Sequence, residues 1–140
     1  MIKTISAKDS ITKTTIAAGF SVIINLILTA IGRVVSMPPE TFGPYMYARV
    51  AEYTLIGVVG AGIVYTLMRR YMDRAKADKY FIILSVVLLV VSFYPDVALP
   101  WSDDLDDIGW TYGIMANLIL MHVIAAGSVV YLFTGDKKSV

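Results

Sequence analysis

The stretch that decides the fold is YFIILSVVLLVVSFYPDVAL, residues 80–99, a largely hydrophobic run that contains a single charged residue, Asp96. A membrane helix needs roughly 20 mainly apolar residues to cross about 30 Å of hydrocarbon. Three further stretches of this kind lie at residues 12–37, 47–68 and 108–133. The sequence therefore predicts an all-α membrane protein, in which residues 1–140 form one domain, a bundle of four transmembrane helices.

The composition of the chain supports this interpretation. Hydrophobic residues make up 57% of it and charged residues 16%, whereas a soluble domain carries roughly 25% charged residues. Its formal net charge of +1 is too balanced to indicate a nucleic-acid partner. Cysteine is absent, which excludes disulfides, thiolate metal sites and thiol nucleophiles. His122 is the single histidine, so one chain cannot build a multi-histidine metal site.

The distribution of basic residues predicts the orientation of the helices. Lys and Arg near the ends of membrane helices are retained on the cytoplasmic side. Most of them lie in the two tails and in the connection between the second and third spans: Lys3, Lys8, Lys13, Arg69, Arg70, Arg74, Lys76, Lys79, Lys137 and Lys138. The opposite side carries Glu40 and an acidic loop at residues 103–107. Both termini are therefore expected to be cytoplasmic, and the first span is expected to be kept rather than cleaved as a signal peptide.

Proline and small residues predict local breaks and packing faces. Pro95 lies inside the third span, where it is expected to kink the helix or end it early. The second span contains Gly57, Gly60 and Ala61. Gly57 and Ala61 form a small-xxx-small pair, which lets another helix approach closely. These three residues are therefore the predicted helix-packing positions.

Six polar residues within or beside the spans are the candidate site: Arg33, Arg49, Glu52, Asp96, Asn117 and His122. An ionisable group at the bilayer centre costs about 2.5 to 3.5 kcal/mol on insertion scales and usually faces the bundle interior or water. One interpretation is an intramembrane ion network that fixes helix register. The other is a pocket open to the outside, lined by Arg33, Glu52, Asp96 and Asn117 with His122 at its floor.

His122 allows three hypotheses. Its imidazole is hydrogen-bonded to a neighbouring helix, or relays protons with Asp96 or Glu52, or ligates haem or a metal in an oligomer or complex. No cofactor and no metal site are predicted. The sequence has no zinc-protease, nucleophile-elbow, P-loop or dinucleotide-binding motif, and so no catalytic residue is predicted.

Four pieces of the sequence carry a family resemblance: the connection at residues 39–44, the Gly-rich run at 57–62, SFYPD at 92–96 and MHVIAA at 121–126. Together they resemble an uncharacterised family of small four-helix prokaryotic membrane proteins, known only as a domain of unknown function. The resemblance implies four spans and a prokaryotic plasma membrane. It draws attention to Asp96 and His122 and implies no reaction.

Three functions remain open from the sequence. The leading hypothesis is a non-enzymatic accessory or scaffold subunit of a homo-oligomer or larger membrane complex, because the chain is small, has no catalytic motif and carries small-residue packing faces. The alternative is a small ion- or proton-coupled transporter or channel protomer, or a lipid or small-molecule binder, that uses the outward-facing pocket. The third is a membrane enzyme with Asp96 or Glu52 as acid or base. The expected partners are the lipid bilayer and other membrane subunits, not nucleic acid.

Overall fold

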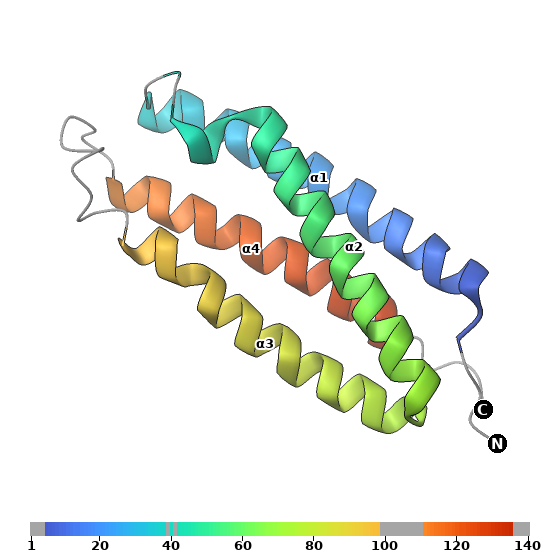
Figure 1. Cartoon of the computed structure of the whole chain (residues 1–140). Helices are drawn as coiled ribbons and strands as arrows, with labels where there is room; N and C mark the ends of the chain where they lie inside the picture. Colours follow the sequence, from blue (N-terminus) through green and yellow to red (C-terminus); the bar gives the residue numbers. More distant parts are fainter. Residues whose placement is uncertain (1–4, 39, 41, 99–110, 136–140) are drawn as a thin grey trace.

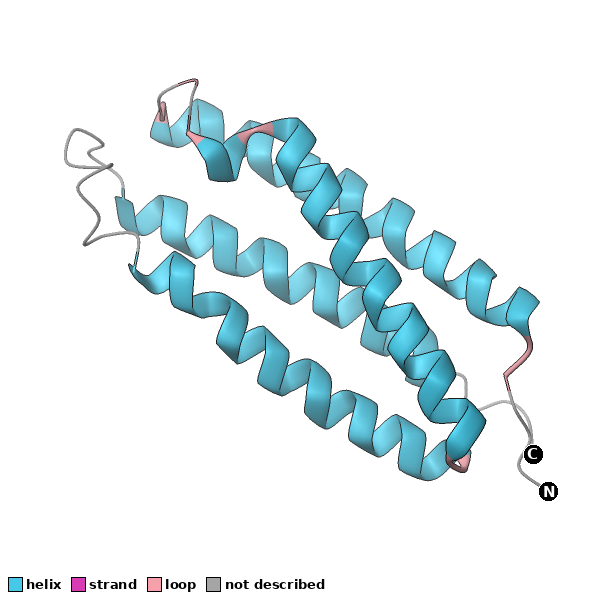
Figure 2. Cartoon of the chain, in the orientation of Figure 1, coloured by secondary structure: helices cyan, strands magenta, loops and turns pink. Residues whose placement is uncertain are grey.

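The computed structural model describes residues 5–38, 40, 42–98 and 111–135. This part of the chain is helical and contains no strand (Figures 1 and 2). Its elements are α1 (Ala7–Ser36), the short 3-10 helix η1 (Gly43–Tyr45), α2 (Tyr47–Tyr71), α3 (Arg74–Ala98) and α4 (Thr111–Thr134). The four long helices are each long and apolar enough to cross a membrane. The prediction of an all-α, four-helix membrane bundle is confirmed.

The first helix is longer than the predicted span and has defined ends. Ser6 caps it, because its hydroxyl oxygen accepts a hydrogen bond from the backbone N–H of Asp9 at 3.0 Å. The helix ends where Met37 takes a left-handed conformation, with φ of 45°. Pro38 follows and cannot continue the hydrogen-bonding pattern. The polar first turn thus extends α1 beyond the hydrophobic run.

The third helix begins earlier than predicted and ends close to the predicted end, at Ala98. It begins at Arg74 rather than near residue 80, since Asp73 Oδ1 accepts a hydrogen bond from the backbone N–H of Lys76 at 3.0 Å. The same bond lowers the pKa of the Asp73 carboxyl. At the other end Pro95 does not terminate the helix early, because α3 continues to Ala98. A proline this close to a helix end removes few backbone bonds. The acidic loop at residues 103–107 lies outside the described residues.

The helices are arranged so that α1 packs against α2 and α4, and α3 packs against α4 (Figure 1). Helices α2 and α3 join in a short turn and diverge from it toward the opposite end of the bundle (Figure 1). Helix α1 begins, and α4 ends, at the same end as this turn. Helices α2 and α3 therefore approach each other mainly beside their turn.

The core is densest beside the α2–α3 turn. Tyr65, Phe81 and Phe133 are each at most 2% exposed, and the Tyr65 ring centroid lies 5.0 Å from that of Phe81 and 4.9 Å from that of Phe133. The Tyr65 hydroxyl also donates a hydrogen bond to Asp78 Oδ1 at 2.5 Å. Aromatic rings from α2, α3 and α4 therefore hold this end of the bundle closed.

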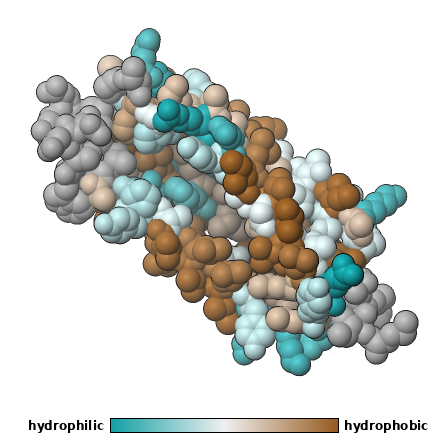
Figure 3. All heavy atoms as spheres, in the orientation of Figure 1, coloured by the Kyte–Doolittle hydropathy of each residue, from teal (hydrophilic) through white to brown (hydrophobic). Residues whose placement is uncertain are grey.

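The outer surface is that of a membrane protein. Hydrophobic side chains gather over the middle of the face shown in Figure 3, and hydrophilic ones gather toward its two ends. Many large hydrophobic side chains on all four helices are exposed, such as Ile23, Ile56, Val90 and Tyr131. Such a surface is stable in contact with lipid chains rather than water.

The close helix contacts use different glycines from those predicted. A side chain at Gly62 would collide with Thr14 of α1, and one at Gly32 would collide with Tyr45 and Asn117. By contrast, a Cβ atom added at Gly57 or Gly60 would meet no atom within 4 Å. Within one chain, the predicted close approach at Gly57 and Gly60 is therefore not formed, because that face of α2 looks away from α1. Ala61 does pack against the core beside Val58 and Tyr65.

Candidate functional site

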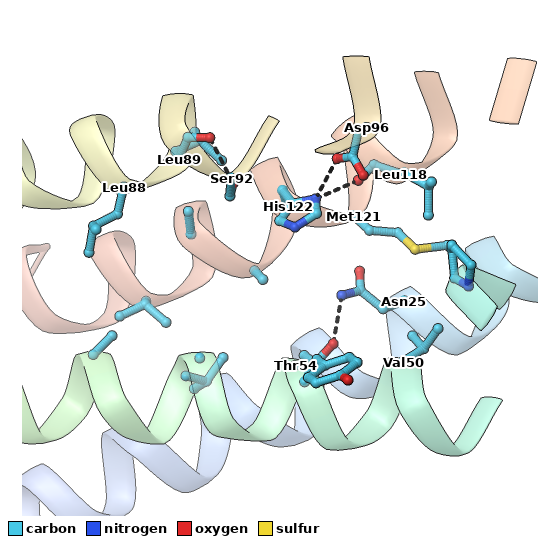
Figure 4. Close-up of a pocket in the computed structure, with 18 of the residues that line it drawn as sticks. Asn25, Val50, Thr54, Leu88, Leu89, Ser92, Asp96, Leu118, Met121 and His122 are labelled. Atoms are coloured by element: carbon cyan, nitrogen blue, oxygen red, sulfur yellow. Dashed lines mark hydrogen bonds and ion pairs between the residues drawn. The ribbon is translucent and has the colours of Figure 1, made fainter. Parts of the chain in front are cut away.

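A cavity of about 550 Å³ lies between α2, α3 and α4, with α1 contributing one residue to its wall (Figure 4). Most of its lining is aliphatic. The polar side chains that line it are Asn25, Arg49, Thr54, Ser85, Ser92, Asp96 and His122. The site is therefore a largely apolar chamber with a few polar groups.

Asp96 and His122 form the centre of the site. Asp96 is 5% exposed on the last turn of α3, and its Oδ2 lies 3.1 Å from Nδ1 of His122 on α4. The same ring nitrogen lies 3.0 Å from the carbonyl oxygen of Leu118. Because a carbonyl oxygen only accepts, Nδ1 carries a hydrogen and donates it to the Leu118 carbonyl oxygen, whereas Asp96 Oδ2 lies at ion-pair distance from the same nitrogen and accepts no hydrogen bond from the described residues. Nε2 is then left for the cavity, which the His122 ring lines (Figure 4).

Asn25 and Thr54 face this pair from the opposite wall. Asn25 Nδ2 on α1 donates a hydrogen bond to Thr54 Oγ1 on α2 at 3.1 Å. Asn25 is 3% exposed, and its Oδ1 has no hydrogen-bond partner among the described residues. In Figure 4 this oxygen turns away from Thr54, toward Met121 and His122. Four helices thus bring polar atoms to one chamber.

The rim of the cavity lies where α2 and α3 diverge. Tyr53, Gly57 and Leu88 line it and are exposed on the side of the bundle. Arg49 lines its other end, beside Gly43. The chamber is therefore open laterally, at the level where a lipid chain would contact the helices.

Of the other charged residues of the predicted site, Arg33 and Glu52 lie outside the cavity, and Arg49 lines one end of it. Arg33 donates from Nη1 to the backbone oxygen of Tyr45 at 3.2 Å, and its guanidinium carbon lies 5.9 Å from the ring centroid of Tyr47. Glu52 is exposed and does not line the cavity. Within the described part of the chain, no ion pair joins Arg33, Arg49 or Glu52 to another residue. The expected ion network is not formed there, because Arg33 is bonded to the Tyr45 backbone and Arg49 lies beside Gly43.

Asn117 also lies outside the cavity. Its Nδ2 donates to the Leu28 carbonyl oxygen at 3.0 Å and to the Tyr45 hydroxyl at 2.8 Å. Tyr45 is completely buried, and burial raises the pKa of its hydroxyl while the bond from Asn117 opposes that shift. The hydrogen bonds of Asn117 therefore join α4 to both α1 and η1, and Asn117 does not line the cavity.

Four polar residues of the cavity wall were not among the predicted site residues: Asn25, Thr54, Ser85 and Ser92. Asn25 lies on the first predicted span, residues 12–37. Its position near the middle of that span, at the same depth as His122, is the signal that could have identified it. Thr54 carries no comparable signal, because a single threonine in a membrane helix commonly bonds its own backbone. Among the described residues, no group of three acidic or histidine side chains could hold a metal ion.

These features define the class of protein: a four-helix membrane protein whose bundle encloses a laterally open chamber lined by a buried Asp96 paired with His122. Residues 6–139 match the model of a family described as a family of unknown function, DUF6069, and the chain belongs to that family. The resemblance to an uncharacterised family is thereby confirmed. Neither the curated proteins nor the solved structures contain a match to the chain.

Proposed function

We propose that this protein binds a small amphipathic molecule inside the membrane, in the chamber between α2, α3 and α4. The observation that carries the proposal is the Asp96–His122 pair, which lines a cavity of about 550 Å³ with mostly aliphatic walls. Binding sites for small molecules are typically 300–1,000 Å³ and combine apolar walls with a few polar groups. An ionisable pair within a membrane is costly and marks a functional site by default.

The lateral opening supports entry from the bilayer. Gly57 and Leu88 lie on opposite sides of the gap, and both are exposed. A molecule dissolved among the lipid chains would pass between α2 and α3 without first entering water. Its apolar part would contact the aliphatic wall, and its polar end would reach Asp96 and His122.

The second candidate function is the leading hypothesis from the sequence, namely an accessory subunit in a larger assembly. The observation that favours it is the open face of α2, where Gly57 and Gly60 have no atom within 4 Å of an added Cβ. Such a small-residue face suits a helix from a second subunit. A helix seated there would close the same gap through which a small molecule would enter.

The two candidates are separated by native mass spectrometry of the protein extracted gently from its own membrane. Gly57→Leu places a side chain in the chamber, whereas Gly60→Leu adds the same side chain outside it. If the chamber binds a small molecule, the wild type and Gly60→Leu retain it and Gly57→Leu does not. Retention that is unchanged in Gly57→Leu, or no retained molecule in the wild type, contradicts the proposal. A fixed complex with another protein, lost in both variants, favours the accessory subunit.

A further inference from the structure

We infer that the group recognised inside the chamber is a primary ammonium carried by an amphipathic molecule. This inference rests on the proposed function, because it names the chemistry of the molecule that the chamber would bind. It is drawn from the polar atoms around the Asp96–His122 pair, which are predominantly hydrogen-bond acceptors.

The first acceptor is the carboxylate of Asp96. Its side chain is 7% exposed, and its Oδ2, which lies 3.1 Å from His122 Nδ1, accepts no hydrogen bond from the described residues. A carboxylate has about four lone-pair positions, so Asp96 keeps unused capacity to accept hydrogen bonds. A nearby positive charge also strongly favours the ionised form of a buried carboxyl group.

The second acceptor is Oδ1 of Asn25, which is enclosed and has no partner among the described residues. Leaving a buried acceptor unsatisfied is costly, so such an atom is normally bonded to a water molecule or a ligand. The amide nitrogen is already committed to Thr54. In Figure 4 the Asn25 oxygen lies on the side of the chamber that faces His122, across from α3. Met121 stands between them, and its unbranched side chain can change rotamer to admit a ligand.

Two more groups in the chamber are hydrogen-bond acceptors. Ser92 donates its hydroxyl hydrogen to the Leu89 carbonyl oxygen at 2.7 Å, so it can offer only lone pairs to the chamber. The neutral form of His122 with a hydrogen on Nδ1 likewise offers a lone pair at Nε2. The site is therefore complementary to a donor with several N–H bonds.

A primary ammonium meets these requirements better than other polar groups. It carries three N–H donors and a positive charge for the Asp96 carboxylate. A quaternary ammonium has the charge but no donor for Asn25, and an anion would be repelled by Asp96. Arg49, which lines the far end of the chamber, makes no ion pair with Asp96 and leaves the carboxylate available to a cation.

The test compares two lipids that differ only in the methylation of one nitrogen. Purified protein in a maltoside detergent is offered equimolar dioleoyl phosphatidylethanolamine and dioleoyl phosphatidylcholine, and native mass spectrometry measures the retained lipid. We expect about tenfold greater retention of the ethanolamine lipid, the effect of a charge-assisted hydrogen bond that the choline lipid cannot make. A parallel competition between dodecylammonium and dodecyltrimethylammonium distinguishes a free amine from a lipid headgroup as the source of the ammonium.

Variants assign the selectivity to the chamber. Asp96→Asn and Asn25→Leu are close in size to the native residues and should each bring the ratio of retained lipids toward one. Asp73→Asn makes the same chemical change at an exposed site outside the chamber and should leave the ratio unchanged. Size-exclusion chromatography checks that each variant is folded. The test requires that at least one of the two chamber variants elutes as the wild type does.

The outcomes separate this inference from the proposed function. Preference for the primary ammonium in either competition, lost in the chamber variants, supports both. If the two members of each probe pair are retained equally, and Gly57→Leu still abolishes their retention, the ammonium inference is overturned and the proposed binding function stands. If no probe is retained, or Gly57→Leu retains as much as the wild type, both are overturned.

Discussion

At the scale of single residues, the described polar side chains of the bundle divide into those that hold the fold and those that face the chamber. Asn117 donates hydrogen bonds to the backbone of α1 and to the Tyr45 hydroxyl, toward the end of the bundle that carries η1. Asp96, His122 and Asn25 line the cavity instead. Residue type alone does not separate the two groups, since Asn117 and Asn25 are both asparagines within hydrophobic helices.

The contact between Asn117 and Tyr45 should contribute measurably to stability. Hydrogen bonds between membrane helices average about 0.6 kcal/mol in double-mutant cycles and reach about 1.7 kcal/mol. We expect Asn117→Ala and Tyr45→Phe each to lower the free energy of unfolding in mixed micelles, with a coupling energy in that range. Tyr112→Phe is the control, because Tyr112 is 70% exposed and should change stability little. Additive effects of the two core variants would contradict the contact.

Tyr45 also predicts a pH dependence. Burial raises the pKa of its hydroxyl above the ordinary value of 10.0, so the unfolded chain loses this proton first as the pH rises. The contribution to stability is therefore complete below pH 10 and is lost as the pH rises through the folded-state pKa. We expect the free energy of unfolding to fall more steeply above about pH 10 in the wild type than in Tyr45→Phe. Equal slopes for the two proteins would show that Tyr45 is not shielded from water.

At the scale of helices, the pattern of small residues identified α2 as a packing helix but misplaced the contact. Gly57 with Ala61 and Gly62 with Thr66 are equally spaced pairs on the same helix. Only the pair that faces α1 can be a close contact within the chain, and Gly62 is the residue against Thr14. The rotation of α2 about its axis, which the sequence pattern leaves open, decides between them.

Alanine substitutions should separate these glycines. Gly62→Ala forces a methyl group against Thr14, and overpacking of this kind typically costs about 1–3 kcal/mol. Gly57→Ala meets no atom and should be neutral or slightly stabilising. Removing the opposing atoms with Thr14→Ala should restore part of the stability lost in Gly62→Ala. Unfolding in mixed micelles measures all four proteins, and a similar loss for both glycine variants would contradict the packing of α1 on α2.

At the scale of the whole molecule, the bundle has two chemically different ends. Arg69, Arg74, Lys76 and Lys79 lie at the end where α2 joins α3, and Glu40 lies beyond the opposite end of α1. Retention of basic residues on the cytoplasmic side predicts that the α2–α3 turn, together with both termini, faces the cytoplasm.

The absence of cysteine makes this orientation easy to test. Lys76→Cys and Glu40→Cys each introduce one thiol at an exposed position on opposite ends of the bundle. In right-side-out membrane vesicles, a membrane-impermeant maleimide should label Glu40→Cys and leave Lys76→Cys unlabelled until detergent is added. The reverse pattern would invert the predicted topology.

The sequence by itself determined the class of fold, because hydrophobic length is a local property: four runs near 20 residues commit the chain to four membrane helices whatever their arrangement. It also singled out Asp96 and His122, since ionisable groups are rare in such runs. It could not show that these two meet each other while Arg33 and Glu52 stay apart from them. Hydrophobicity around these helices varies little with direction, so it does not specify which face of each helix turns inward. Interhelical contacts decide that rotation, such as Gly62 against Thr14, the Ser21 hydroxyl 2.6 Å from that of Ser128, and Asn117 bonded to the Leu28 carbonyl oxygen. The divergence of α2 from α3 creates the chamber that Asp96 and His122 line.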